Sequence, residues 1–114
     1  MPEFVGEMDA PTMYVKIQYC GGWGYRPHVN AFIAKIKEEL KDNKIQYQLI
    51  MDVGTTGNFE IHKYGTIDLT DEAVLIWSKQ EKGGFPMKDD AAMSGIYDKL
   101  KAWGSSFLKM SEMT

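Results

Sequence analysis

The stretch Tyr19-Cys20-Gly21-Gly22-Trp23-Gly24-Tyr25 carries the only cysteine of the chain, at the end of an apolar strand-like segment and before a helix-like one. A strand that runs through such a loop into a helix places the cysteine sulfur at the helix N-terminus, where backbone N–H groups and the helix dipole favour a thiolate. In a Cys-x-x-Cys loop the fourth position holds a second sulfur, whereas this chain has Trp23 there. An indole cannot attack a disulfide, so the usual dithiol cycle cannot run within this chain.

The segments on both sides of the loop have the patterns of a strand, a helix and a second strand. Residues 13–19 and residues 45–51 alternate apolar and polar side chains, as half-buried strands do. Between them, Pro27 suits the first turn of a helix that runs to about Asn43. The apolar residues of this helix recur at spacings of three, four and seven: Val29, Phe32, Ile33, Ile36 and Leu40. A helix of crossover length joins the two strands, so we expect them to be parallel.

The second half of the chain predicts two more strands and a closing helix. Residues 59–64 and 73–78 are strand-like and are separated by a turn-rich stretch, which favours an antiparallel pair. The last helix begins near Asp89 or Asp90, either of which can cap it. One stripe carries its apolar residues: Met93, Ile96, Tyr97, Leu100, Trp103 and Phe107. This βαβββα order predicts an α/β domain with a thioredoxin-like core, in which two helices cover one face of a mixed four-stranded sheet.

Length and composition indicate one small soluble domain. The chain has 114 residues, of which 44% are hydrophobic and 25% charged, and no apolar run approaches the ~20 residues that cross a bilayer. We expect the domain to span residues 13–104, between an N-terminal extension, 1–12, and a C-terminal tail, 105–114. The first ten residues contain no basic region and no arginine, which predicts neither a secretory nor a mitochondrial signal and favours the cytoplasm.

The loop and three later segments resemble the selenoprotein W family, also called Rdx. Tyr-Cys-Gly-Gly-x-Gly-Tyr is the active-site signature of that family, whose thioredoxin-like members carry Cys-x-x-Sec or Cys-x-x-Cys. The later segments that resemble it are Gly57-Asn58-Phe59-Glu60-Ile61, Val74-Leu75-Ile76-Trp77-Ser78-Lys79 and Lys82-Gly83-Gly84-Phe85-Pro86. Together they cover roughly residues 13–103. The chain departs from the family pattern at Trp23, in a longer loop over residues 65–72, and at both ends.

The resemblance places Trp23 at the selenocysteine position, and three interpretations remain open. The tryptophan codon UGG differs by a single nucleotide from UGA, which encodes selenocysteine in this family, so the residue in the protein is selenocysteine or cysteine if a UGA was translated as Trp. In the second interpretation the tryptophan is real, covers the old active site and leaves the fold as an interaction module. In the third it is a structural aromatic residue in an unrelated fold.

Cys20 has a structural and a chemical interpretation. A free cysteine at a strand end is often a small buried apolar residue. The strand-to-helix position, with glycines beside it and Arg26 and His28 nearby in sequence, favours a redox position instead. A competent thiol would form a mixed disulfide or a glutathione adduct, which an outside thiol would have to resolve. The residues expected to line its pocket or to contact a partner are Gly21, Gly22, Gly24, Tyr25 and Phe85.

Two hypotheses of function follow. The first is a small thiol-dependent redox protein linked to glutathione or thioredoxin, with Cys20 as the attacking thiol and position 23 as its partner if that residue is Sec or Cys. In that case the protein is an oxidoreductase. The alternative is a redox-inactive interaction module or a subunit of a larger protein assembly. In the family, the Phe85 loop lies close to the redox turn, so Phe85 either walls a pocket beside Trp23 or plugs the core.

Other classes of function are disfavoured. A net charge of −3 opposes binding to nucleic acid and to anionic lipid, because both need a positive field. The single cysteine excludes an internal disulfide and, with no His-x-x-x-His pair, predicts no structural metal. The glycine loop lacks the order of a nucleotide-binding motif. We therefore expect no cofactor other than glutathione as a redox partner.

Overall fold

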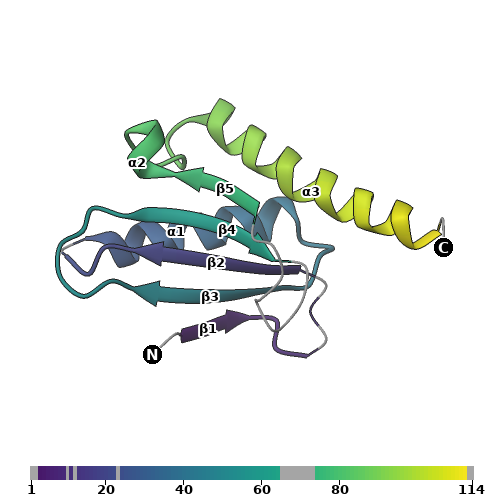
Figure 1. Cartoon of the computed structure of the whole chain (residues 1–114), viewed down its shortest axis with the longest axis horizontal. Helices are drawn as coiled ribbons and strands as arrows, with labels where there is room; N and C mark the ends of the chain where they lie inside the picture. The colour runs from purple at the N-terminus through teal and green to yellow at the C-terminus, as the bar shows by residue number, and fades with distance from the viewer. Residues whose placement is uncertain (1–2, 10, 12, 23, 65–73, 113–114) are drawn as a thin grey trace.

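The protein folds as one open β-sheet with its helices (Figure 1). The computed structural model describes residues 3–9, 11, 13–22, 24–64 and 74–112, with side chains to residue 101. The elements in chain order are β1 (Glu3–Gly6), β2 (Met13–Tyr19), α1 (Tyr25–Glu39), β3 (Ile45–Met51), β4 (Phe59–Tyr64), β5 (Val74–Ser78), α2 (Lys79–Lys82) and α3 (Asp90–Glu112). The expected α/β class and the order of its core elements are confirmed.

The strands lie in the order β1-β3-β2-β4-β5. The crossover through α1 makes β2 and β3 parallel, as the length of the connection predicted. The β4–β5 pair is antiparallel, again as predicted, and β4 also runs antiparallel to β2. The sheet is therefore mixed, with β2 and the cysteine that follows it near the centre (Figure 1).

The sheet has five strands, so the expectation of four was wrong. The additional strand, β1, comes from the segment expected to be an N-terminal extension, and it pairs antiparallel with β3. Its Val5 packs against the core. At Gly6 the backbone has φ +92°, and a Cβ there would lie 2.5 Å from the carbonyl oxygen of Ile45. A four-residue strand with one inward apolar side chain has no periodic sequence signal, which explains why β1 was missed.

The helices also differ in detail from the expectation. A four-residue helix, α2, follows β5, because the Ser78 side chain accepts from the Glu81 N–H and caps it. Helix α1 ends at Glu39 and not near Asn43. Helix α3 begins at Asp90, where the Asp89 side chain accepts from two backbone N–H groups, so the expected start and cap are confirmed. It runs through Glu112, into the segment expected to be a tail.

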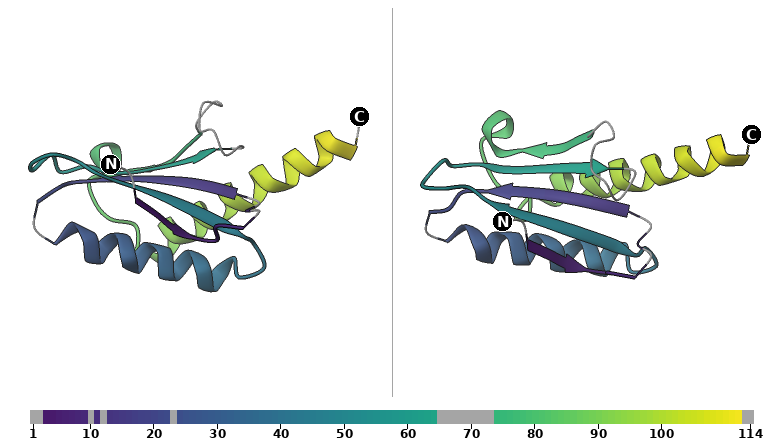
Figure 2. Two further views of the ribbon diagram at one scale, coloured as in Figure 1. Left: turned by 90° about the horizontal axis from the view of Figure 1, so that it is seen from below. Right: turned by 60° about the horizontal axis from the view of Figure 1, so that its bottom comes forward.

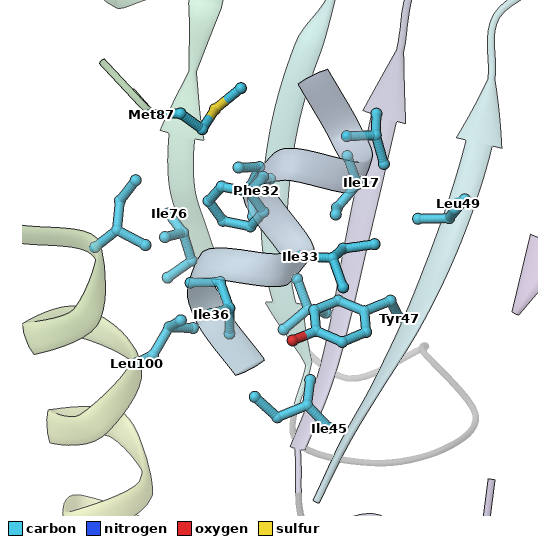
Figure 3. Close-up of a cluster of buried hydrophobic side chains, with 14 of the residues drawn as sticks. Ile17, Phe32, Ile33, Ile36, Ile45, Tyr47, Leu49, Ile76, Met87 and Leu100 are labelled. Carbon is cyan, nitrogen blue, oxygen red and sulfur yellow. The ribbon is translucent and has the colours of Figure 1, made fainter. Parts of the chain in front are cut away.

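Both long helices lie on the same side of the sheet (Figure 2). The inward side chains of the strands and the apolar stripes of α1 and α3 form a single cluster of buried residues. Figure 3 shows Phe32 and Ile36 of α1 facing the sheet, with Ile76 and Leu100 alongside. This packing fixes α1 against β2, and so positions the loop between them that carries the cysteine.

Candidate functional site

Cys20 directly follows β2 and precedes the first turn of α1, as the sequence predicted. The residue is 1% exposed. Its backbone N–H donates to the carbonyl of Asn58 at 2.8 Å. Its Sγ accepts a hydrogen bond from the N–H of Gly22 at 3.2 Å. The thiol therefore lies at the junction between strand and helix, under a second loop of the chain.

That second loop joins β3 to β4 and consists of residues 52–58, here called the covering loop. It lies at the same end of the sheet as the loop from β2 to α1 (Figure 1). The Gly54 carbonyl accepts from the N–H of Gly21 at 3.0 Å and lies 4.0 Å from Cys20 Sγ. The sequence placed no functional residue in this loop.

The glycines beside Cys20 allow the two loops to approach this closely. A Cβ at Gly21 would lie 2.2 Å from the Asp52 carbonyl oxygen and 2.9 Å from that of Gly54, distances that no side-chain carbon tolerates. Gly24 has φ +80° at the N-cap of α1, where glycine adopts the left-handed conformation without strain. Of the glycines predicted at the site, Gly21 is thus required for close approach and Gly24 for the turn into the helix.

Hydrogen bonds at the sulfur lower the pKa of the Cys20 thiol below its ordinary value. The largest effect comes from a backbone hydrogen bond of Gly57, while burial opposes it by disfavouring the charged form. The backbone N–H groups of Gly22 and Thr56 act in the same direction. The Gly22 N–H before the helix and the backbone of the covering loop therefore both favour the thiolate.

Asp52 is the polar centre of the covering loop. Its Oδ1 accepts from the Gln18 side chain at 2.8 Å, and its Oδ2 accepts from the Thr56 hydroxyl and, at 2.9 Å, from Asn58 Nδ2. Partial burial by itself raises the pKa of a carboxyl, but these three hydrogen bonds outweigh it and lower the pKa of Asp52. Gln80 adds a link from α2, because its side chain donates to Asn58 Oδ1 at 3.0 Å.

Aromatic side chains gather at the start of α1. Phe85 stacks on His28 with ring centroids 4.0 Å apart and lies edge-on to Tyr25 and Phe59. Lys79 Nζ lies 5.8 Å from the ring centroids of Tyr25 and Phe85. The structure thus brings together Tyr25 and Phe85, two of the residues expected at the site. Trp23, also expected there, lies outside the described residues, and so does its predicted contact with Phe85.

An ion pair fixes the other side of the α1 N-terminus. Arg26 donates to both carboxylate oxygens of Glu3 in β1, at 2.8 and 2.9 Å, and also reaches the Tyr19 hydroxyl at 3.4 Å. The hydrogen bond from Arg26 lowers the pKa of Glu3. The sequence pointed to Arg26 but not to Glu3, since the two residues are 23 positions apart and the contact between β1 and α1 has no local sequence signal.

Other kinds of site find no support in the part of the chain that the structure describes. It contains no group of three or more His, Cys, Asp or Glu side chains that could hold a metal ion. No helix among the described residues is long and apolar enough to pass through a membrane. A hollow of about 400 Å³ is lined by residues of β1, the α1 C-terminus and the start of β3, away from the cysteine loop.

A cysteine between a central strand and a helix, in an open mixed sheet with two helices on one face, defines the thioredoxin-like class. Residues 14–92 match the model of the Rdx family. The chain therefore belongs to the Rdx family, as its loop signature predicted. It is 31% identical over 86 residues to Migration and invasion enhancer 1 of Mus musculus, an alignment that covers 75% of this chain and 64% of that relative. The chain thus spans less than two thirds of that relative's length, and no solved structure matches it significantly.

Proposed function

We propose that the protein is a small thiol-dependent redox protein of the cytoplasm, in which Cys20 is the attacking thiol and glutathione or thioredoxin is the redox partner. One observation carries the proposal: Cys20 lies between the end of β2 and the first turn of α1, where its Sγ accepts a hydrogen bond from the Gly22 N–H. The lowered pKa of the thiol supports it. The thiolate is the form that attacks disulfides, so a lowered pKa increases the reactive fraction near neutral pH. Membership of a family with a thioredoxin-like fold supports the same class of chemistry.

The proposed reaction is thiol–disulfide exchange with oxidised glutathione. The Cys20 thiolate attacks one sulfur of that disulfide, a new S–S bond joins Cys20 to a glutathionyl group, and the other half leaves as glutathione thiolate. A second thiol, from glutathione or reduced thioredoxin, then attacks the mixed disulfide and releases the Cys20 thiolate. Cys20 is oxidised in the first step and reduced in the second.

The residue at position 23 determines how the mixed disulfide is resolved. With tryptophan there, only an outside thiol can resolve it, and the mechanism is monothiol. With selenocysteine or cysteine there, residue 23 attacks Cys20 from within the chain and the protein works as an oxidoreductase with two reactive positions. The intact mass of the protein from its natural source distinguishes these cases.

Mass spectrometry of the folded protein tests the proposal. After incubation with oxidised glutathione, we expect the intact mass to increase by one glutathionyl group, and reduced thioredoxin or excess glutathione to reverse the increase. The matched control, Cys20→Ser, must gain no mass. Absence of the adduct in the folded protein, together with its formation in the urea-unfolded protein, contradicts the proposal, because the thiol is then present but inert.

The burial of Cys20 favours a second candidate function, a redox-inactive interaction module or subunit of a larger assembly. A residue that is 1% exposed reacts only when its cover moves. In this function the partner contacts the glycine loop together with Tyr25 and Phe85, which are partly exposed. Size-exclusion chromatography of the protein from its natural source checks it. Elution solely at the 13.0 kDa of the free chain counts against it.

A further inference from the structure

The covering loop is attached to the sheet at its ends, while its middle is held by side chains and by one backbone hydrogen bond, from the Gly21 N–H to the Gly54 carbonyl at 3.0 Å. The Asp52 N–H donates to the Tyr19 carbonyl at 2.8 Å, which continues the ladder between β2 and β3. The Asp52 carboxylate then reaches forward to the Thr56 hydroxyl and the Asn58 amide, and sideways to Gln18 on β2. Asp52 therefore joins the rigid sheet to the far half of the loop.

The backbone of the covering loop allows it to open. Gly54 and Gly57 have φ values of +85° and +76°, and glycine can leave such conformations at low cost. These two glycines lie on either side of Thr55 and Thr56. On the outer side, Val53 is 99% exposed, so no described residue holds this part of the loop down from outside. Hydrogen bonds to a carboxylate are among the stronger ones in proteins, so the Asp52 contacts add substantially to the Gly21–Gly54 backbone hydrogen bond and the Gln80 link in keeping the loop closed.

We propose that Asp52 is a positioning residue that holds the covering loop closed over Cys20 and thereby controls the access of outside sulfur compounds to the thiol. The inference rests on the proposed thiol chemistry of Cys20 and adds a residue that the chemistry depends on. With the covering loop closed, the Cys20 thiol is 1% exposed and is out of reach of other sulfur compounds. The thiol therefore reacts only while the loop is open, and the Asp52 contacts set how often the loop opens.

Opening changes two properties of Cys20 in opposite directions. It exposes the sulfur, which speeds every reaction of the thiolate. It also removes the effect of the covering loop, chiefly of the Gly57 backbone, that lowers the pKa of the thiol, so this pKa then moves up toward its ordinary value. The hydrogen bonds of Asp52 to Thr56 and Asn58 are here called the latch. A variant with a weakened latch should therefore react faster at high pH, where the Cys20 thiol is fully ionised, and its reaction should begin at a higher pH.

Alkylation of Cys20 by iodoacetamide, followed by intact mass from pH 5 to pH 10, measures both properties. For Asp52→Asn, which replaces an acceptor carboxylate by an amide of the same shape, we expect the plateau rate at high pH to rise about tenfold, the effect of losing one charged hydrogen bond. The midpoint of the pH profile should move upward. Thr56→Val should act in the same direction, whereas Thr56→Ser, which keeps the hydroxyl, should match the wild type.

Asp42→Asn is the matched control, because Asp42 is an exposed aspartate in the turn after α1. It should leave the rate and the midpoint unchanged. The proposal is overturned if Asp52→Asn has the plateau rate of the wild type, or if its rate rises only as much as its population of globally unfolded protein, measured by urea unfolding. If Asp52→Asn does not fold, the Thr56→Val and Thr56→Ser pair decides by the same criteria.

This experiment and the glutathione experiment fail separately. If no glutathione adduct forms but Asp52→Asn accelerates alkylation, the loop is a latch over a thiol that does not exchange with glutathione, and the proposed function fails. If the adduct forms in the wild type and Asp52→Asn changes neither rate nor midpoint, the proposed function stands and the latch is overturned.

Discussion

Lys63 Nζ donates to the main-chain carbonyl of Leu100 in α3 at 3.0 Å, inside the apolar layer between the sheet and the helices. Lys63 is 1% exposed, and it comes from an inward position of β4. Burial of its ammonium group lowers the pKa of Lys63 from 10.5 to about 8. The contact ties α3 to β4, but it does so with a charge that would be better solvated in the unfolded chain.

The first prediction is that Lys63 makes stability depend on pH. Between pH 8 and pH 10.5 the unfolded chain keeps a proton that the folded chain has released, so the free energy of unfolding rises with pH in this window, by about 3 kcal/mol. Lys63→Met removes this contribution. The stability of the wild type relative to Lys63→Met should therefore increase from pH 7 to pH 10 in urea unfolding. A difference that stays constant across this range contradicts the assigned pKa.

Gly21→Ala is predicted to destabilise the fold at the cysteine loop. The new Cβ would lie 2.2 Å from the Asp52 carbonyl oxygen, and because both groups belong to backbone held by hydrogen bonds, one loop must move. We expect a loss of about 1–3 kcal/mol, as overpacking usually costs, measured by urea unfolding. Gly84→Ala is the control, since a Cβ there meets nothing within 4 Å. An equal effect of both changes would show that the close approach is not the cause.

Glu3→Gln is predicted to loosen β1. The change removes the charge that Arg26 pairs with, so the backbone amides of β1 should exchange with deuterium faster, while those of β2 keep their rates. The hydrogen bond from Arg26 lowers the pKa of Glu3, so the pairing is present above the ordinary pKa of the carboxyl and is lost as pH falls through the lowered one. Glu7→Gln should leave β1 exchange unchanged. Unaltered β1 exchange in Glu3→Gln means that strand pairing alone holds β1.

The sequence predicted the elements whose burial is periodic. The strands at 45–51 and 59–64 were predicted to the residue, because every second side chain of β3 and most of β4 faces the core. The end of α1 was placed too late because Leu40, the last apolar residue of the stripe, is buried although it only caps the helix. Periodicity follows burial and not hydrogen bonding, so it extended the helix into the turn.

The sequence predicted the cysteine loop of the site but not the covering loop. Cys20 and its glycines form a contiguous motif, and such a motif can be recognised in one sequence. Asp52 and Thr56 belong to a polar turn between two strands, which by itself has the composition of any solvated loop. They lie beside the cysteine loop because β2 and β3 are adjacent and parallel, so the carboxyl ends of these strands and the loops that follow them lie together. Only the strand order brings this out.

Phe85→Ala is predicted to separate the two interpretations of Phe85. The ring contacts His28, Tyr25 and Phe59, so its removal should cost about 2–4 kcal/mol in urea unfolding, toward the lower end because Phe85 is partly exposed. Phe85→Leu should recover part of this loss by refilling the space without the stacking. If Phe85 only plugs the core, the rate at which folded Phe85→Leu forms the glutathione adduct should equal that of the wild type. If Phe85 walls the pocket of Cys20, that rate should change although the fold is kept.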